Sequence, residues 1–356
     1  MSTSSKSVSS SPSGSNRTLH EALDAYAQSS GHLRSSAHAT RLSRVGLLKQ
    51  RHPDCSLTRL TNDVASRMMW EWQSRPLTRR GTPYSFSFVR QMLGELLRFF
   101  TWLDLNDEYG WSMPRGLMSS YVNVRRFVRD RQVSKQPSIY TPEQLAVLSK
   151  HATPLDRLTL FVALNCAMSS SQLGLLRVSN VLLDHEHEHA KYLGFESSPE
   201  DSWIRTRRPR TGELGEWRLW PETTAILRWG VERAHRLGSE FVFVNSEGQP
   251  MWDEMSHKPH NPFSNLWNRL LRRVRETEPV FPAFPLGSMR NVLPEFLRRE
   301  YGDEMAAICL THHRSRCLEH HSVKPFGLFH KAMMKASEFF ACVFTSIKDD
   351  LPSRDD

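Results

Sequence analysis

The sequence lacks any hydrophobic run long enough to cross a membrane. Its longest apolar stretch, residues 158–168, is interrupted by Thr159 and Asn165, which excludes a transmembrane helix and is typical of a buried one. Serine dominates residues 1–16, which contain no apolar segment of the length that a secretory signal has. We therefore expect neither a secretion signal nor a membrane partner.

Cysteine and tyrosine are also scarce. The five cysteines are scattered through the chain, which excludes a disulfide framework and indicates a reducing compartment, so we expect a cytoplasmic protein. Only seven tyrosines occur, and none follows Tyr301. The last part of the chain therefore has no phenolic nucleophile.

Acidic side chains are too few to balance the basic ones. Lysine and arginine number 47 against 38 aspartates and glutamates, which gives a formal net charge of +9. Most of the basic residues are arginines, which pair with phosphate through two parallel hydrogen bonds and stack on bases. Together with ten tryptophans, this composition favours a nucleic-acid partner, although a generic basic surface would give the same totals.

The first part of the chain shows helical periodicity throughout. Apolar residues recur at helical spacing near residues 19–26, 62–72 and 89–103. This pattern predicts a bundle of helices over residues 18–129, preceded by a disordered serine-rich tail at residues 1–17.

Two segments of this part have the composition of connections. Residues 29–40 mix small residues with histidine and arginine, which predicts a turn. Residues 130–139 are polar and basic and contain Pro137, so they are predicted to be the linker between two domains.

The second part mixes helix and strand signals. Thr141, Pro142 and Gln144 have the order of an amino-terminal cap, a first helical proline and a capping-box partner, which predicts a helix start. Residues 211–213 are expected to turn a β-hairpin. Residues 140–345 are therefore predicted to be mainly α-helical with a small β-sheet, followed by loose acidic residues 346–356. The predicted strands are residues 191–195, 202–206, 216–220 and 241–245, and the last predicted helix covers residues 332–344.

Three motifs follow one another in the last third of the chain. The string Phe284-Pro-Leu-Gly-Ser-Met-Arg290 is followed by Cys309-Leu-Thr-His312, and His321 lies nine residues further on. This order resembles the carboxy-terminal boxes of the tyrosine recombinase (phage integrase) family, which breaks and rejoins DNA through a phosphotyrosine. The order of elements, a helical domain, a basic linker and a helix-rich domain with a small sheet, is also similar.

The resemblance implies both a fold and a partner. Residues 140–345 would have the integrase catalytic fold, and residues 18–129 would be the helical, SAM-like core-binding domain that completes a clamp on double-stranded DNA. The family function is site-specific DNA recombination and DNA integration, often by a mobile element, so we expect a nucleoid-associated protein that forms a homo-oligomer on DNA. The resemblance implies no cofactor, no metal and no small-molecule substrate, because the phosphotyrosine stores the bond energy.

Some family positions keep residues of the expected type. Arg290 and His312 stand at the family's second arginine and at the histidine that follows it. Arg210 stands at the position of the hairpin lysine, and His321 stands at the position of the tyrosine. These four residues are the predicted catalytic positions.

Two other positions differ from the family pattern. The first arginine box becomes Cys166-Ala-Met-Ser169-Ser-Ser-Gln172, so Ser169 stands where the arginine is expected. The His-x-x-Arg box becomes Gly287-Ser-Met-Arg290, so Gly287 replaces the histidine.

These replacements bear on the family reaction, in which guanidinium groups hold the scissile phosphate, lysine protonates the leaving oxygen and tyrosine attacks. Ser169 offers a hydroxyl but no charge, and Gly287 offers no side chain. Arg210 keeps its proton near neutral pH, so it is a poor general acid. We therefore expect a DNA-binding pseudoenzyme with impaired strand cleavage. The alternative is an active recombinase with a non-standard nucleophile such as His321.

Arginines concentrate where the family touches DNA. Arg205, Arg207 and Arg208 share one arm of the predicted hairpin, where like charges side by side would repel without an anionic partner. Arg90 and Arg98 lie toward the polar side of the helix at residues 89–103. We predict that all five contact DNA, with a solvent-facing strand as the alternative for the hairpin.

Other interpretations remain open. Cys309, His312, Cys317 and His320 have the types and intervals of zinc ligands, but the recombinase box accounts for the same stretch, so no metal is predicted. Residues 185–189 alternate histidine and glutamate and are predicted to form a solvated loop, with adventitious metal binding as the alternative. A module that has kept only the fold and binds no DNA is a third hypothesis, and the carboxy-terminal helix either packs on its own domain or exchanges into a neighbour.

Overall fold

The computed structural model describes residues 17–31, 35–114, 116–117, 124–125, 139–208, 212–252, 262–312 and 325–345. These residues form two compact units, which we call unit 1 (before position 135) and unit 2 (from position 135 onward). No helix among the described residues is both long and apolar enough to cross a membrane. The predicted tail, most of the predicted linker and the predicted acidic end lie outside the described residues.

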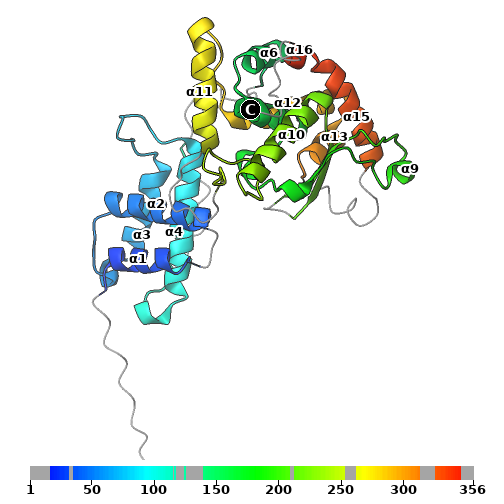
Figure 1. The fold of residues 1–356 in the computed structure, drawn as a ribbon. Coiled ribbons are helices and arrows are strands. Elements are labelled where there is room, and N and C mark those ends of the chain that lie inside the picture. The colour runs from blue at the N-terminus through cyan, green and yellow to red at the C-terminus, as the bar shows by residue number, and fades with distance from the viewer. Residues whose placement is uncertain are drawn as a thin grey trace, which may run out of the picture. The chain divides into compact units, whose positions relative to one another are not determined.

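Unit 1 is a bundle of α-helices (Figure 1). Thr18 begins the first helix through a capping box, in which its side chain accepts from the Glu21 N–H while the Glu21 carboxylate accepts from the Thr18 N–H. The helices predicted near residues 62–72 and 89–103 are confirmed. The helices of unit 1 are α1 (Leu19–Gln28), α2 (Ser35–Arg51), α3 (Asn62–Gln73) and α4 (Phe86–Asp104), with short 3₁₀ turns at Leu57–Arg59 and Asp107–Tyr109.

The apolar face of α4 forms the centre of this bundle. Val89, Met92, Leu96 and Phe99 recur at helical spacing and are all completely buried. The turn predicted at residues 29–40 is shorter than expected, because α2 already begins at Ser35. Alanine favours a helix, and serine and threonine disfavour it only weakly, so packing of the amphipathic remainder of α2 can extend the helix across these residues.

Unit 2 packs helices against a small sheet (Figure 1). Thr141 and Gln144 form the predicted capping box at its first helix. The helices of unit 2 are α6 (Pro142–Lys150), α7 (Pro154–Cys166), α8 (Ser170–Gly174), α9 (Ala190–Leu193), α10 (Pro221–Arg236), α11 (Pro262–Thr277), α12 (Met289–Tyr301), α13 (Asp303–Cys309), α15 (Phe326–Phe339) and α16 (Cys342–Thr345), with 3₁₀ turns at Val178–Asn180 and Leu286–Ser288.

The sheet has three antiparallel strands in the order β1 (Val181–Leu182), β2 (Trp203–Arg207) and β3 (Leu214–Arg218). The register of the β2–β3 pair runs from Trp203 opposite Arg218 to Arg207 opposite Leu214. The predicted hairpin is thus confirmed, and β1 is an additional strand that the sequence did not predict.

Three predicted elements of unit 2 were wrong in type or extent. Residues 191–195 form no strand, because residues 191–193 belong to α9 and Gly194 adopts a left-handed conformation (φ 73°) that ends this helix. Residues 241–245 make only isolated bridges, because the chain turns back at Asn245 to bond Gln249 instead of finding a long partner strand. The last predicted helix is two helices, α15 and α16, which a break near Phe340 separates.

Candidate functional site

Arg290 lies where three helices of unit 2 meet. It is the second residue of α12 and is partly exposed. Its Nη1 donates to Gln172 Oε1 at 3.3 Å, and its Nη2 donates to the main-chain oxygen of Leu310 at 3.1 Å. Since Gln172 belongs to α8 and Leu310 ends α13, the two bonds orient the guanidinium against both helices.

Ser169, at the first-arginine position, joins the same group of residues. Gln172 Oε1 accepts from the Ser169 main-chain N–H at 3.2 Å and from Ser169 Oγ at 3.0 Å, in addition to Arg290. The side chain of Gln172 is therefore the common acceptor of the site, although sequence reasoning had treated it only as a part of the box. The cluster contains one guanidinium, one hydroxyl and one neutral amide.

The turn after α13 presents two carbonyl groups to arginines. Thr311 adopts a left-handed conformation (φ 52°), and the His312 N–H bonds back to Ala307 O at 2.9 Å. Arg290 bonds to Leu310 O, and Arg208 Nη1 donates to the next carbonyl, Thr311 O, at 3.3 Å. The exposed residue His312 follows directly. The structure therefore brings Arg290, Arg208 and the main chain at His312 together.

The remaining predicted catalytic positions have different outcomes. Arg210 and His321 lie outside the described residues. Gly287 is exposed in the 3₁₀ turn before α12, and a Cβ atom built on it would meet nothing within 4 Å. The backbone at this position therefore leaves room for a side chain, although the sequence supplies none.

The hairpin arginines have different environments. Arg207 is exposed, and its Nη1 bonds to Gly212 O at 3.1 Å. Arg205 instead turns toward the interior, where its Nε lies 2.6 Å from Glu216 Oε2. The two neighbouring arginines therefore differ in how readily they could meet a ligand in solvent.

Glu216 holds a buried polar cluster in unit 2, which we call the Glu216 cluster (Glu216, His187, His330 and Arg205). Its Oε1 lies 2.9 Å from His187 Nε2 and 2.8 Å from His330 Nε2. Burial acts to raise the pKa of Glu216, but the hydrogen bond from His330 and the nearby positive groups outweigh it and lower this pKa to about 2. The prediction of a solvated loop at residues 185–189 was thus wrong for His187, which is buried.

Two histidines and a glutamate are also a common metal-ligand set, and their ligand atoms lie within 4.8 Å of one another. However, His187 Nδ1 accepts from the His189 main-chain N–H at 3.1 Å, so its ring proton lies on Nε2. A metal ion would need the lone pair of that Nε2 atom. Arg205 already neutralises the carboxylate, so the geometry favours a hydrogen-bonded cluster over a metal centre.

The zinc alternative at residues 309–320 is not supported by the described residues either. Cys309 is completely buried in the core, and burial strongly raises the pKa of its thiol. A cysteine buried in this way acts as a small hydrophobic residue of the core. Cys317 and His320 lie outside the described residues.

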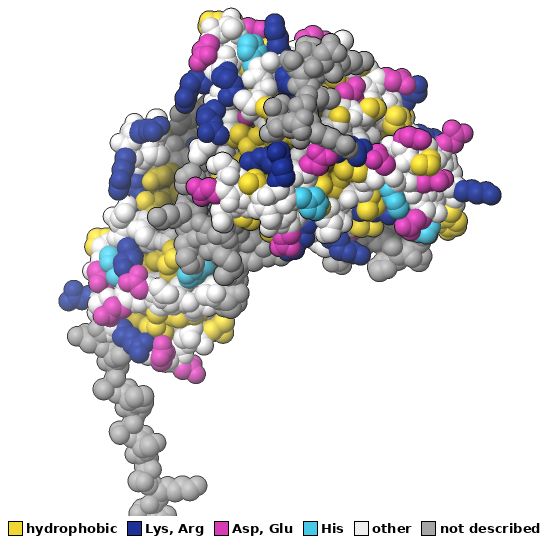
Figure 2. All heavy atoms as spheres, in the orientation of Figure 1, with side chains coloured by type: hydrophobic (Ala, Val, Ile, Leu, Met, Phe, Trp, Pro, Cys, Tyr) yellow, Lys and Arg dark blue, Asp and Glu magenta, His cyan; other side chains and the backbone are white. Residues whose placement is uncertain are grey.

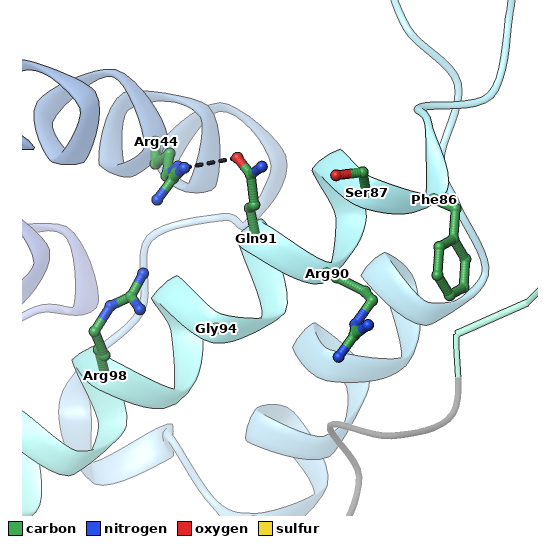
Figure 3. Close-up of a pocket in the computed structure, with 7 residues that line it drawn as sticks. All are labelled: Arg44, Phe86, Ser87, Arg90, Gln91, Gly94 and Arg98. Carbon is green, nitrogen blue, oxygen red and sulfur yellow. Dashed lines mark hydrogen bonds between the residues drawn. The ribbon is translucent and has the colours of Figure 1, made fainter. Parts of the chain in front are cut away.

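Unit 1 contains a surface cleft of about 390 Å³ between α2 and α4 (Figure 3). Arg90 and Arg98, both predicted to contact DNA, line it together with Arg44, which bonds to Gln91 Oε1 at 2.7 Å. Sequence reasoning missed Arg44, because only the fold brings α2 beside α4. Phe86, Ser87, Gln91 and Gly94 complete the lining.

A second basic surface was also missed. Figure 2 shows Lys and Arg side chains gathered along the edge that α11 forms. Arg269, Arg272 and Arg275 are exposed on this strongly amphipathic helix. The signal was present in the sequence as a run of arginines that recur three residues apart.

Comparison with known proteins identifies the fold. No protein-family model and no curated protein sequence matches the chain. A crystal structure of a lambda integrase tetramer bound to a Holliday junction is similar, with a TM-score of 0.56 and 13% identity, and the match covers 84% of this chain and 79% of that one. A lambda integrase dimer bound to a COC′ core site matches with a TM-score of 0.56 and 14% identity over 85% of this chain and 95% of that one.

The Tn1549 transposon integrase in complex with transposon right end DNA is similar as well, with a TM-score of 0.52 and 12% identity over 91% of this chain and all (100%) of that chain. At such low identity the likeness shows the fold alone. The predicted fold class, mainly helical with a small sheet and built like the integrases, is confirmed.

Proposed function

We propose that this protein binds duplex DNA with the fold of the tyrosine recombinases and that its strand-cleavage activity is lost or weak. The observation that carries the proposal is the meeting of Arg290, Arg208 and the turn that ends at His312. Two guanidinium groups oriented on consecutive carbonyls form a cationic surface suited to a phosphodiester. A phosphate is the ligand that such a surface prefers.

The DNA contacts in this proposal extend over both units. Residues 18–129 act as the core-binding domain, with Arg90 and Arg98 toward DNA, and residues 140–345 act as the catalytic-fold domain. Arg207 and the exposed face of α11 add cationic groups in unit 2. The similar integrases were solved bound to DNA as dimers and tetramers, which supports duplex DNA as the partner and a homo-oligomer as the assembly. We expect the protein at the nucleoid, in the cytoplasm.

The chemistry of the site supports impaired cleavage. Ser169 brings no positive charge to the phosphate, and its hydroxyl is already bonded to Gln172. No tyrosine follows Tyr301 in the sequence. Since a catalytic set of this kind acts as a unit, the loss of several members removes most of the rate.

The binding proposal is tested by the salt dependence of duplex affinity. Each phosphate contact contributes about 0.9 to the slope of log K against log salt, so Arg290→Gln should reduce the slope by about one and the affinity roughly tenfold at low salt. The matched control is Arg298→Gln, since Arg298 lies on the same helix, carries the same charge and is ion-paired with Glu295 at the surface. Equal effects of the two variants would contradict the proposed site, and no retention of duplex DNA by the wild type would favour a module that binds no DNA.

The cleavage proposal is tested separately with a nicked suicide duplex. We expect no covalent protein–DNA band after denaturing electrophoresis. A band that disappears in His321→Ala would instead establish an active recombinase with a non-standard nucleophile. Mass photometry of the protein with a duplex then measures the oligomeric state.

A further inference from the structure

Glu95, in the middle of α4, is a buried acid surrounded by arginines. Its side chain is 2% exposed, whereas those of Arg41, Arg44 and Arg98 are 17%, 20% and 52% exposed. Each carboxylate oxygen accepts two hydrogen bonds: Oε1 accepts from Tyr26 Oη at 2.8 Å and Arg41 Nε at 3.1 Å, and Oε2 accepts from Arg44 Nη1 at 3.1 Å and Arg98 Nη2 at 2.7 Å. We call these five residues the Glu95 array.

The array contains more positive charge than one carboxylate needs. A buried carboxylate is satisfied by one well-placed guanidinium and hydrogen bonds to its remaining lone pairs. Three arginines around one glutamate leave two positive charges in excess, and like charges this close repel one another unless an anion joins them. Burial acts to raise the pKa of Glu95, but the bonds from Arg98, Tyr26 and Arg44 outweigh it, so the acid stays ionised.

The excess charge lies beside the cleft of unit 1. Arg44 and Arg98 belong both to the array and to the cleft lining, where Arg90 joins them (Figure 3). Arg44 is held at both ends of its guanidinium, by Glu95 through Nη1 and by Gln91 through Nη2 at 2.7 Å. The guanidinium of Arg41 lies over the Tyr26 ring, 4.7 Å from its centre. The arginines are therefore oriented by the protein before any ligand arrives.

We propose that Glu95 is a positioning residue for DNA binding: it orders Arg41, Arg44 and Arg98 into a preformed binding surface for the phosphodiester backbone. This inference rests on the proposed function, because it assumes that duplex DNA is the ligand. Long arginine side chains lose rotamer freedom on binding, and a carboxylate that fixes them beforehand removes much of that loss. A negative residue then strengthens binding to a polyanion.

The proposal therefore predicts in which direction the DNA affinity of a Glu95 variant changes. Glu95→Gln keeps the shape of the side chain and raises the formal net charge from +9 to +10, by removal of one of the 38 acidic residues. If charge alone mattered, the affinity for duplex DNA would rise. We expect it to fall roughly tenfold at low salt, with a salt slope lower by about one to two, because fewer phosphates are contacted.

Asp63→Asn is the matched control. Asp63 is an exposed residue of α3, so this variant makes the same change in net charge without touching the array. We expect its affinity to equal or exceed that of the wild type. The inference is overturned if Glu95→Gln behaves like Asp63→Asn while the wild type binds DNA, and the proposed function itself fails only if the wild type does not bind.

Tyr26→Phe provides a second test of the inference in case Glu95→Gln does not fold. It keeps every charge and the ring beneath Arg41, and it removes only the hydroxyl that donates to Glu95. Circular dichroism checks the fold, and fluorescence anisotropy with a random-sequence duplex measures the affinity. We expect a loss of roughly twofold to threefold, in line with one weakened anchor. Unchanged affinity in Tyr26→Phe would also overturn the inference.

Discussion

Each unit of the molecule contains a buried glutamate with several polar partners, Glu95 in unit 1 and Glu216 in unit 2, and the two carboxylates have different partners. Glu95 in unit 1 is bonded to three arginines and a tyrosine, whereas Glu216 in unit 2 is bonded to one arginine and two histidines. The arginines of Glu95 reach the surface, with side-chain exposures from 17% to 52%. The histidines of Glu216 are 2% and 0% exposed.

The comparison indicates that the role of a buried carboxylate depends on whether arginines or histidines are bonded to it. Arginine stays charged at any pH that a folded protein meets, so the Glu95 array directs permanent positive charge outward. Histidine can be neutral and buried, so the Glu216 cluster connects elements in the interior of unit 2. It connects β3, the segment before α9, and α15, with the rings of Trp203 and Phe195 packed around His330.

The largest expected effect separates the two carboxylates by stability. Glu216→Ala leaves Arg205 and two buried histidines without their acceptor, so we expect a loss of about 3–5 kcal/mol in the free energy of unfolding. Glu95→Ala should lose only about 1–2 kcal/mol, because its arginines can turn toward water. Urea titration of the full chain measures both values. Hydrogen exchange should localise the first loss to β3 and α15, and equal losses would remove the distinction.

The next prediction compares how tightly the two units are packed around one glycine in each. A Cβ atom on Gly327, at the start of α15, would lie 1.8 Å from Leu193 O, so Gly327→Ala must displace α15 from α9. We expect about 2–3 kcal/mol of destabilisation, within the range for overpacked sites. In unit 1, nothing lies within 4 Å of a Cβ atom on Gly46 in α2, so Gly46→Ala should stabilise by about 0.5–1 kcal/mol. Thermal denaturation of the two variants should thus show shifts of opposite sign.

The comparison also shows how much the sequence could predict. The helix starts at Thr18 and Thr141 depend on residues three positions apart, so local chemistry predicted them. The motif from Arg290 to His312 likewise predicted that the arginine begins one helix and that the histidine follows the next, as α12 and α13 do. The partners of Glu95 come from α1, α2 and α4, and those of Glu216 come from segments that lie up to 114 residues away in the chain. No local pattern encodes such contacts.

The errors have the same physical origin. His187 lies in a segment that alternates histidine and glutamate, which is the usual composition of a solvated loop. Its burial depends on Glu216, Phe195 and Trp203, which surround it only in the folded chain. Gln172 was expected only as part of a box, and its role as the common acceptor of Ser169 and Arg290 requires α8 and α12 to be in contact.

The next prediction concerns how the stability of unit 2 depends on pH, because the Glu216 cluster contains the buried histidine His330. Burial lowers the pKa of His330 more than Glu216 raises it, and its buried Nδ1 makes no hydrogen bond within the described residues. Among the described residues, His187, Arg205 and Arg218 are further positive or titratable groups of this region. As pH falls through 6.5, the unfolded chain binds a proton that folded His330 refuses, so stability falls toward acid by up to about 1.4 kcal/mol per pH unit.

His330→Asn should make the free energy of unfolding less dependent on pH between 7.5 and 5.5, as urea titrations at the two pH values would show. Glu95 adds no slope there, since its lowered pKa keeps its contribution intact until pH falls below the ordinary glutamate pKa of 4.5. Unit 1 has its own acid-sensitive group in His52, where burial and the charge of Arg51 lower the pKa to about 4. His52→Gln is therefore the corresponding variant for unit 1, and a pH slope unchanged by His330→Asn would argue against a neutral His330.

The smallest expected effect is a change in DNA affinity, and it tests whether the Glu216 cluster takes part in DNA binding. Arg205 and Arg207 lie two residues apart on β2, but Arg205 is bonded to Glu216 while Arg207 is exposed. Arg207→Gln should weaken duplex binding severalfold and lower the salt slope by about one. Arg205→Gln removes the same charge and should change affinity by less than about twofold, because its guanidinium already compensates a buried acid. If anisotropy titrations found the opposite order, Glu216 would be organising a DNA contact just as Glu95 is proposed to do, and the two carboxylates would have one role instead of two.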